Sequence, residues 1–417
     1  MSEIDDMVAG LAARAKTASR ALARASDEQK SLALKAAASA LIAAQDIILA
    51  ANAKDMAAGE KRGLSAAMLD RLKLDTGRLS AIASAVEQVA ILEDPVGQVI
   101  DSNARPNGLV MKRVRVPIGV LGIIYESRPN VTADAAALGV RSGNAVILRG
   151  GSEAVNSNHA IFKAMVTGIE SAGLPADAII LMPTQDRAAV GAMLRAQGQI
   201  DMIIPRGGKS LVARVQDEAR VPVLAHLDGI CHIYVHSGAD PDMAKAIVLN
   251  AKMRRTGICG AMESLLIDQD YPAPADLVRA LIDAGCEVRA DDALMELDAR
   301  TVSAVEEDWD TEYLEPIVSA CMVDSVEEAV AHIARHSSGH TESIITSDEA
   351  VAKRFQMEVD SAIVMHNAST QFADGGEFGL GAEIGIATGR LHARGPVALE
   401  GLTTYKWLVQ GQGQVRP

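Results

Sequence analysis

One segment of the chain combines a cysteine with the residue types that make a thiol reactive. Lys252-Met-Arg-Arg-Thr-Gly-Ile-Cys-Gly260 places Cys259 between two glycines and behind three basic side chains. Glycines let a substrate or backbone approach the sulfur closely, and positive charge lowers the pKa of a thiol and attracts anions. The pattern predicts a nucleophilic Cys259 acting on an anionic substrate, with Arg254 and Arg255 as candidate anion ligands. An inert cysteine with solvated basic neighbours is the alternative.

The other cysteines and the histidines give no comparable signal. Cys231, Cys286 and Cys321 show no paired short spacing, so neither a disulfide framework nor a zinc site is indicated, and thiols fit a reducing compartment. His332, His336 and His340 follow one another at helical spacing. We expect Gly339 to end that helix and turn His340 away, and no acidic or cysteine ligand completes the set. No metal is therefore predicted.

Three loops have the character of phosphate-binding turns. They cover residues 149–152, 183–186 and 205–210, and each leads from an apolar run into a helical pattern. Free N–H groups at a helix N-terminus bind phosphate, so a nucleotide site is predicted here. The alternative is that glycines 150, 151, 207 and 208 only make tight turns. GxGxxG is absent, and Ile203 stands where a P-loop needs its first glycine, which disfavours a kinase or an ATPase.

The elements that must position these loops alternate along the chain. Residues 1–95 have apolar residues at helical spacing and predict a set of helices. Strands are predicted at 144–148, 178–182, 200–204 and just before His226, separated by helices at 152–172, 185–197 and 209–219. Strand and helix in this alternation are typical of a parallel sheet, which binds ligands outside the carboxyl ends of its strands.

The pattern restarts after His226, and this predicts a second α/β domain. Strands at 233–235 and 263–267 alternate with helices at 241–253 and 325–336, and strand 362–365 precedes a glycine-rich loop at 375–389. We predict a nucleotide-binding domain over 1–226, to which 361–395 returns, and a catalytic domain over 227–360 that carries Cys259. Residues 100–116 and 400–417 are predicted oligomerisation strands, with the exposed tail pairing with another subunit.

Charge and hydropathy narrow the class of protein. A net charge of −14 over 417 residues argues against a nucleic-acid or anionic membrane partner, because both need summed positive potential. The acidic N-terminus lacks the features of a signal peptide, and no apolar run approaches the roughly 18 residues of a membrane span. A cytoplasmic protein is the expectation.

Longer blocks of sequence carry a family resemblance. Thr256-Gly-Ile-Cys-Gly260, placed after the nucleotide-binding half, resembles the nucleophile segment of the aldehyde dehydrogenase superfamily. Within it, the chain closely resembles the γ-glutamyl phosphate reductase family over essentially its whole length, in blocks 116–132, 147–153, 204–209, 335–342, 378–386 and 391–396. The resemblance implies an α/β fold of two parallel-sheet domains with a small β oligomerisation flap. It also implies a small-molecule glutamyl substrate, NADP(H) as cofactor and a homo-oligomer, and it leaves contact with glutamate 5-kinase open.

The implied reaction is the reduction of γ-glutamyl phosphate by NADPH to glutamate 5-semialdehyde in proline biosynthesis, through a thioester on Cys259 with release of phosphate. Hydrolytic relatives carry a Glu-Leu-Gly-Gly segment whose Glu activates water, whereas this chain has His226-Leu-Asp-Gly229. The thioester is thus expected to survive until phosphate attacks it. The alternatives are a hydrolytic or other acylating aldehyde dehydrogenase, and a non-catalytic nucleotide-binding assembly protein. The intact Cys259 segment argues against the last.

The resemblance also implies roles for particular residues. Asn130 is the candidate oxyanion amide beside the Cys259 backbone N–H, although a direct match of the superfamily motif places Ser127 there. Candidate cofactor ligands are Arg149, Gly150, Gly207, Gly208, Lys209, Ser210 and Glu312, with Arg149 also facing the 2′-phosphate. Candidate substrate ligands are Arg128, Arg254, Arg255, His336, Ser338 and His340.

Overall fold

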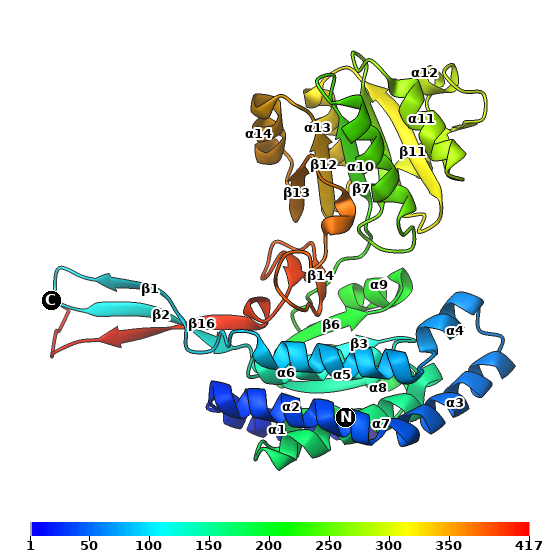
Figure 1. The fold of residues 1–417 in the computed structure, drawn as a ribbon. Coiled ribbons are helices and arrows are strands. Elements are labelled where there is room, and N and C mark those ends of the chain that lie inside the picture. Colours follow the sequence, from blue (N-terminus) through cyan, green and yellow to red (C-terminus); the bar gives the residue numbers. More distant parts are fainter. Residues whose placement is uncertain (1, 417) are drawn as a thin grey trace. The chain divides into compact units, whose positions relative to one another are not determined.

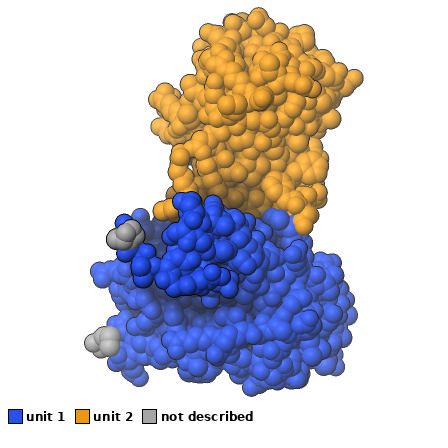
Figure 2. All heavy atoms as spheres, turned by 90° about the vertical axis from the view of Figure 1, so that its left-hand side faces the viewer, with its two compact units in different colours: residues 1–225, 380–385, 397–417 blue, residues 226–379, 386–396 orange. Residues whose placement is uncertain are grey.

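The computed structural model describes residues 2–416 and divides the chain into two compact units (Figures 1 and 2). The first unit comprises residues 1–225, 380–385 and 397–417, and the second comprises 226–379 and 386–396. Each unit contains its own parallel sheet.

Five helices open the first unit, as the spacing of apolar residues predicts. They are α1 (Glu3–Leu22), α2 (Asp27–Ala43), α3 (Gln45–Lys61), α4 (Ala66–Leu72) and α5 (Thr76–Ile91). Ser2, Ser26, Ser65 and Asp75 cap four of them by accepting a backbone N–H of the first turn. No single described helix is long and apolar enough to cross a membrane; α2 and α3 pass such a test only as a pair, and they are bent by 66°.

The sheet of the first unit has four parallel strands in the order β5-β4-β3-β6. They are β3 (Val120–Tyr125), β4 (Ala145–Gly150), β5 (Ile179–Leu181) and β6 (Met202–Arg206), alternating with α6 (Asn130–Arg141), α7 (Val155–Ser171), α8 (Arg187–Arg195) and α9 (Lys209–Glu218). This alternation confirms the predicted parallel sheet. The strand expected before His226 is wrong, because there Val223 makes only an isolated bridge to Ile203.

A three-stranded antiparallel flap also belongs to the first unit (Figure 1). It consists of β1 (Val99–Ala104), β2 (Val110–Pro117) and β16 (Thr403–Gln410) in the order β1-β2-β16. The C-terminal strand β16 pairs with β2 of its own chain, from Thr403 opposite Pro117 to Gln410 opposite Val110. Tyr405, Trp407 and Leu408 of β16 are exposed.

The second unit is built on a seven-stranded parallel sheet in the order β10-β9-β11-β8-β7-β12-β13. In chain order the strands are β7 (Cys231–Val235), β8 (Met262–Asp268), β9 (Glu287–Ala290), β10 (Val302–Ser303), β11 (Ile317–Val323), β12 (Thr341–Ile345) and β13 (Ile363–His366). The helices are α10 (Pro241–Met253), α11 (Pro274–Asp283), α12 (Asp292–Met295), α13 (Val326–His336) and α14 (Glu349–Glu358). Two clusters of buried hydrophobic side chains, contributed by both the sheet and these helices, form the core of the unit.

The predicted return of residues 361–395 to the first domain is wrong for most of that stretch. Strand β13 pairs in parallel with β12, so backbone hydrogen bonds hold it at the edge of the second sheet. Of the stretch, only residues 380–385 belong to the first unit. The chain passes between the units at a small two-stranded sheet of β14 (Gly385–Ala387) and β15 (Gly395–Val397).

Candidate active site

Cys259 lies in the loop that joins α10 to β8, and the side chain of Gln371 holds this loop in place. Gln371 Nε2 donates to the carbonyls of Ala251 at 2.8 Å and Arg255 at 3.2 Å, and its Oε1 accepts from Arg254 Nη1 at 3.2 Å. The Gln371 side chain is buried. Sequence reasoning missed this residue, because a glutamine far along the chain carries no local sign of such a contact.

The segment from His226 to Ile230 lies directly against Cys259. A Cβ atom added at Gly229 would stand 2.2 Å from the Cys259 carbonyl oxygen and 2.7 Å from its Cα, so only glycine fits. The Gly229 N–H donates to Glu312 Oε1 at 3.0 Å, and the Ile230 N–H donates to Ser338 Oγ at 2.9 Å. Glu312 and Ser338 therefore hold the segment that supports the cysteine.

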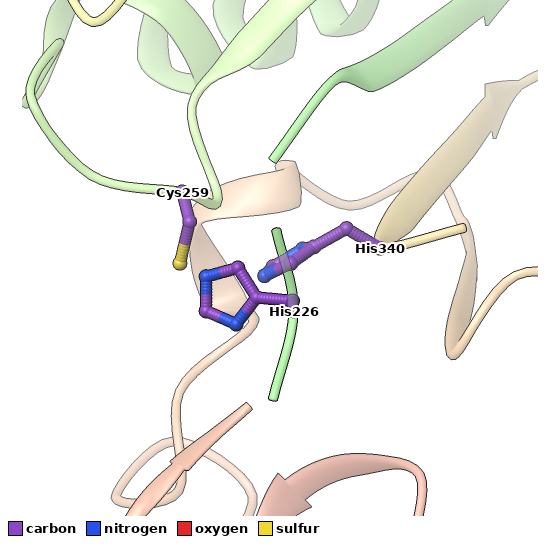
Figure 3. Close-up of side chains that lie close together, drawn as sticks. All are labelled: His226, Cys259 and His340. Carbon is purple, nitrogen blue, oxygen red and sulfur yellow. The ribbon is translucent and has the colours of Figure 1, made fainter. Parts of the chain in front are cut away.

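Two histidines from distant parts of the second unit converge on the sulfur (Figure 3). Cys259 Sγ and one ring nitrogen each of His226 and His340 all lie within 4.8 Å of one another. The two rings meet edge to face, with centroids 5.1 Å apart. His226 Nδ1 donates to the Ile386 carbonyl at 2.8 Å, because a carbonyl can only accept. The neutral ring then carries its lone pair on Nε2, where it can accept a proton from a thiol.

The environments of the four cysteines distinguish Cys259 from the rest. Cys231, Cys286 and Cys321 are buried, whereas Cys259 is partly exposed. Burial raises the pKa of Cys231 well above its usual value and raises the pKa of both Cys286 and Cys321 to about 12. These three side chains are thiols at neutral pH, and only the thiolate is a good nucleophile.

Not every predicted substrate ligand joins this cluster. Gly339 follows α13 with a φ of 70°, and the chain turns there. The side chain of His340 therefore lies next to Cys259 and not beside His332 and His336. Burial lowers the pKa of His340 to about 3, with His226 adding a smaller effect, so its ring is neutral. His336 Nδ1 instead donates to Asp310 Oδ1 at 2.9 Å, and the centroid of its ring lies 4.7 Å from that of His332. Arg254 and Arg255 are exposed.

Lys252 does not supply a free positive charge to Cys259, although its position seven residues earlier in the sequence suggests that it would. Its side chain is fully buried in an ion pair with Glu263, and both partners have 0% exposure. Burial raises the pKa of Glu263 to about 7, although Lys252 opposes that shift. Glu263 Oε1 also accepts the N–H of Leu314 at 3.3 Å. The pair therefore anchors α10 to β8 and to the segment after Glu312.

Replacing Lys252 with methionine is expected to destabilise the protein by roughly 3–5 kcal/mol, because it leaves Glu263 buried without its partner. Urea unfolding followed by far-UV circular dichroism measures the change. Lys245→Met is the matched control, since Lys245 lies on the same helix but is exposed. Equal unfolding midpoints for the two variants would show that the ion pair contributes nothing.

In the first unit, the three predicted loops meet at one cavity of about 340 Å³. Arg149 and Ser152 line it after β4, Gln185 and Arg187 after β5, and Ser210 after β6. This is the carboxyl edge of the parallel strands, where such sheets bind ligands. Arg187 belongs to no motif that the sequence shows, so only the fold reveals its place in the cavity.

The donors around this cavity suit an anionic ligand. Arg149 donates to the carbonyls of Gly150 at 2.7 Å and Gln185 at 2.9 Å, and its Nε is buried with no hydrogen-bond partner. Burial lowers the pKa of Arg149; Glu153 opposes this shift, and neighbouring Arg187 adds to it. A nearby anion would relieve both effects. A nucleotide phosphate therefore fits the residues present.

Four other residues that the sequence analysis names in the first unit, Ser127, Asn130, Gly207 and Gly208, lie beside carboxylates. The N–H of Gly208, which precedes α9, donates to Glu126 Oε2 at 3.2 Å, and a Cβ added at Gly207 would stand 2.6 Å from the same oxygen. Lys209 and Ser210 form the first turn of α9. Asn130 begins α6 and donates to Asp134 Oδ2 at 2.8 Å. Ser127, with a φ of 43°, donates through Oγ to Glu153 at 2.9 Å, and Arg128 follows it.

Comparison with known proteins identifies the family. Residues 2–308 match the aldehyde dehydrogenase family. The chain is 70% identical to the γ-glutamyl phosphate reductase of Novosphingobium aromaticivorans over 99% of its own length and 97% of the relative's. It is 68% identical to that of Sphingopyxis alaskensis over 99% and 96%.

A solved structure agrees with these relatives. The crystal structure of γ-glutamyl phosphate reductase from Thermotoga maritima is 43% identical, with a TM-score of 0.96 over 98% of this chain and all of that one. The predicted α/β fold is thereby confirmed. The chain belongs to the aldehyde dehydrogenase family and, within it, to the γ-glutamyl phosphate reductases.

Proposed function

We propose that this chain reduces γ-glutamyl phosphate to glutamate 5-semialdehyde with NADPH and releases phosphate, a step of proline biosynthesis in the cytoplasm. The observation that carries the proposal is the position of Cys259, partly exposed and within 4.8 Å of His226 and His340, in a chain that shares 70% of its residues with a γ-glutamyl phosphate reductase.

The chemistry at Cys259 follows from this geometry. His226 accepts the thiol proton, and the sulfur attacks the acyl carbon of the substrate. The carbon–oxygen bond to phosphate breaks, phosphate leaves with the electron pair, and a thioester on Cys259 remains. A bound nicotinamide nucleotide supplies the hydride that reduces it. Collapse of the resulting thiohemiacetal returns the thiolate and releases the aldehyde. The Cys259 N–H and the Asn130 amide are the proposed donors to the oxyanion.

The cavity of the first unit is the proposed nucleotide site. Arg149 and Arg187 would bind the 2′-phosphate of NADP(H) through their guanidinium groups. Glycines 150, 207 and 208 with Lys209 and Ser210 would face the pyrophosphate, and Glu312 the nicotinamide ribose. Substrate anions would be bound by Arg128, Arg254 and Arg255, with His336, Ser338 and His340 lining the substrate site.

The histidine at position 226 favours phosphate over water as the nucleophile that attacks the Cys259 thioester in the reverse reaction. Position 226 carries no carboxylate, which is the base that hydrolytic relatives use to activate water, and the proposed role of His226 is to accept the proton of Cys259. A hydrolytic aldehyde dehydrogenase is therefore the second candidate.

We further propose that the flap of β1, β2 and β16 joins copies of this chain, because β16 leaves an exposed apolar edge. Contact with glutamate 5-kinase would deliver the labile substrate.

The reverse reaction tests the proposal. With glutamate 5-semialdehyde and NADP⁺, the formation of NADPH, read at its absorbance, is expected to depend on added phosphate and to fall at least about tenfold with NAD⁺. The Arg187→Ala variant is expected to lose most of that preference, because a ligand of the 2′-phosphate is gone. Turnover to free glutamate at the same rate without phosphate would support the hydrolytic candidate instead.

A further inference from the structure

The convergence of two imidazoles and one thiol in the second unit matches a set of ligands that Zn²⁺ prefers. The candidate ligand atoms of His226, Cys259 and His340 all lie within 4.8 Å of one another (Figure 3). With Zn–N bonds of about 2.0–2.1 Å and Zn–S bonds of about 2.3 Å, the ligand atoms of a tetrahedral site lie roughly 3.3–3.6 Å apart. Small rotations of the Cys259 and His226 side chains would close the difference.

Both rings are held in the way that metal-binding histidines are held. Such a histidine uses its other ring nitrogen to contact a carbonyl or a polar side chain, which fixes its tautomer and its orientation. His226 Nδ1 donates to the Ile386 carbonyl at 2.8 Å. His340 Nδ1 lies 2.8 Å from Thr341 Oγ1 and 3.6 Å from Cys231 Sγ. These contacts fix the orientation of both rings and leave Nε2 of His340 for a ligand.

The second, independent sign of a ligand is an unpartnered buried nitrogen. His340 has 0% exposure, and its Nε2 atom has no hydrogen-bond partner. Buried polar atoms are nearly always paired, so an atom of this kind calls for an explanation, and an absent ion is one. Cys259 and His226 are only partly buried, which leaves a path for an ion to enter.

We propose that His226, Cys259 and His340 form a binding site for Zn²⁺ or another thiophilic divalent cation, which captures the nucleophile and reversibly inhibits the enzyme. The Cys259 thiol loses its proton to solvent and forms one sulfur–metal bond, each imidazole adds one nitrogen–metal bond, and water completes the tetrahedron. No electrons are transferred. Metal binding is independent of the proposed reaction, and only the inhibition rests on it.

Cobalt gives the binding a spectroscopic signature. Titration of the reduced full-length protein with Co²⁺ is expected to produce a thiolate-to-cobalt charge-transfer band at one equivalent, which Zn²⁺ abolishes and Mg²⁺ does not. Cys259→Ser is expected to lose the band. His340→Asn is expected to raise the Kd for Zn²⁺ at least about 100-fold. It removes a metal ligand, and losing only a residue that hydrogen-bonds a ligand already costs about 10- to 100-fold. His226→Asn should do the same, and it covers the case in which buried His340 does not tolerate substitution.

Two variants control for other binding sites. Cys231→Ala removes the other thiol near His340, and His159→Asn removes an exposed histidine of the first unit. Both are expected to keep the band and the Kd. A band that persists in Cys259→Ser, one that disappears in Cys231→Ala, or a Kd unchanged by His226→Asn would overturn the proposal. In the wild type, Zn²⁺ should abolish turnover and EDTA should restore it; inhibition that EDTA does not reverse would contradict reversible capture.

Discussion

Replacing Cys259 with alanine is expected to lower kcat for NADPH oxidation with γ-glutamyl phosphate by at least about 10⁴-fold, because the thioester can no longer form. No other cysteine can take over the reaction. Cys231 lies close by, with its S–H donating to the Cys259 carbonyl at 3.1 Å, but burial keeps it protonated. Stopped-flow absorbance of NADPH measures the loss.

Mass spectrometry gives a second readout that does not require turnover. Incubation with glutamate 5-semialdehyde and NADP⁺ in the absence of phosphate is expected to add one glutamyl group to the wild type and none to Cys259→Ala. Cys286→Ala is the matched control, since Cys286 is a buried thiol in the core of the same unit. It should be acylated normally and lose only stability. Turnover within tenfold of the wild type in Cys259→Ala would rule out the thioester mechanism.

A single methyl group at Gly229 is expected to have an effect nearly as large. Gly229→Ala would place Cβ 2.2 Å from the Cys259 carbonyl oxygen and 2.7 Å from its Cα, and backbone atoms cannot move aside as flexible side chains can. The loop must shift, and a displacement of about 1 Å at a catalytic group can lower the rate on the order of 10²-fold. Steady-state kcat, measured with circular dichroism as a check on folding, tests this.

The control for this substitution is Gly257→Ala in the loop of the cysteine itself. Gly257 is exposed, and the nearest atom to its added Cβ is the Leu314 carbonyl oxygen, 3.9 Å away. That variant should keep kcat within about threefold, because ordinary van der Waals contact costs little. If Gly229→Ala were as active as Gly257→Ala, the close approach would have no part in positioning the nucleophile.

Much of the fold was predictable because local patterns encode it. Alternating apolar runs and helical spacing placed β4 to β6 and α7 to α9 nearly at their observed bounds, and the helix predicted at 325–336 agrees with α13, which Ser325 caps. Strand β13 shows where such patterns stop. Its sequence predicts a strand, but the periodicity of a sequence does not show which strand it pairs with. That partner is β12 of the second sheet. The domain boundary after residue 360 was wrong for that reason.

The candidate site likewise contains residues that local patterns indicate and residues that only the fold brings together. Cys259 and the loops of the cavity have local signatures, namely glycines and basic residues at short spacing. The residues around Cys259 do not: His226 and His340 approach its sulfur and Gln371 binds its loop from three separate segments, and only the fold brings them together. Lys252 illustrates the opposite error. Its position beside the cysteine suggested a free charge, whereas the sheet supplies a buried Glu263 to neutralise it.

The pairing of β16 with β2 has a consequence for synthesis. Residues 403–410 leave the ribosome after residues 226–379, yet they complete a sheet begun by residues 99–117. By then residues 226–379 have all emerged and can fold in order, with every strand of their sheet available. The second unit can therefore fold on the nascent chain while the first unit still lacks this strand, and until β16 emerges β2 stands as an unprotected sheet edge.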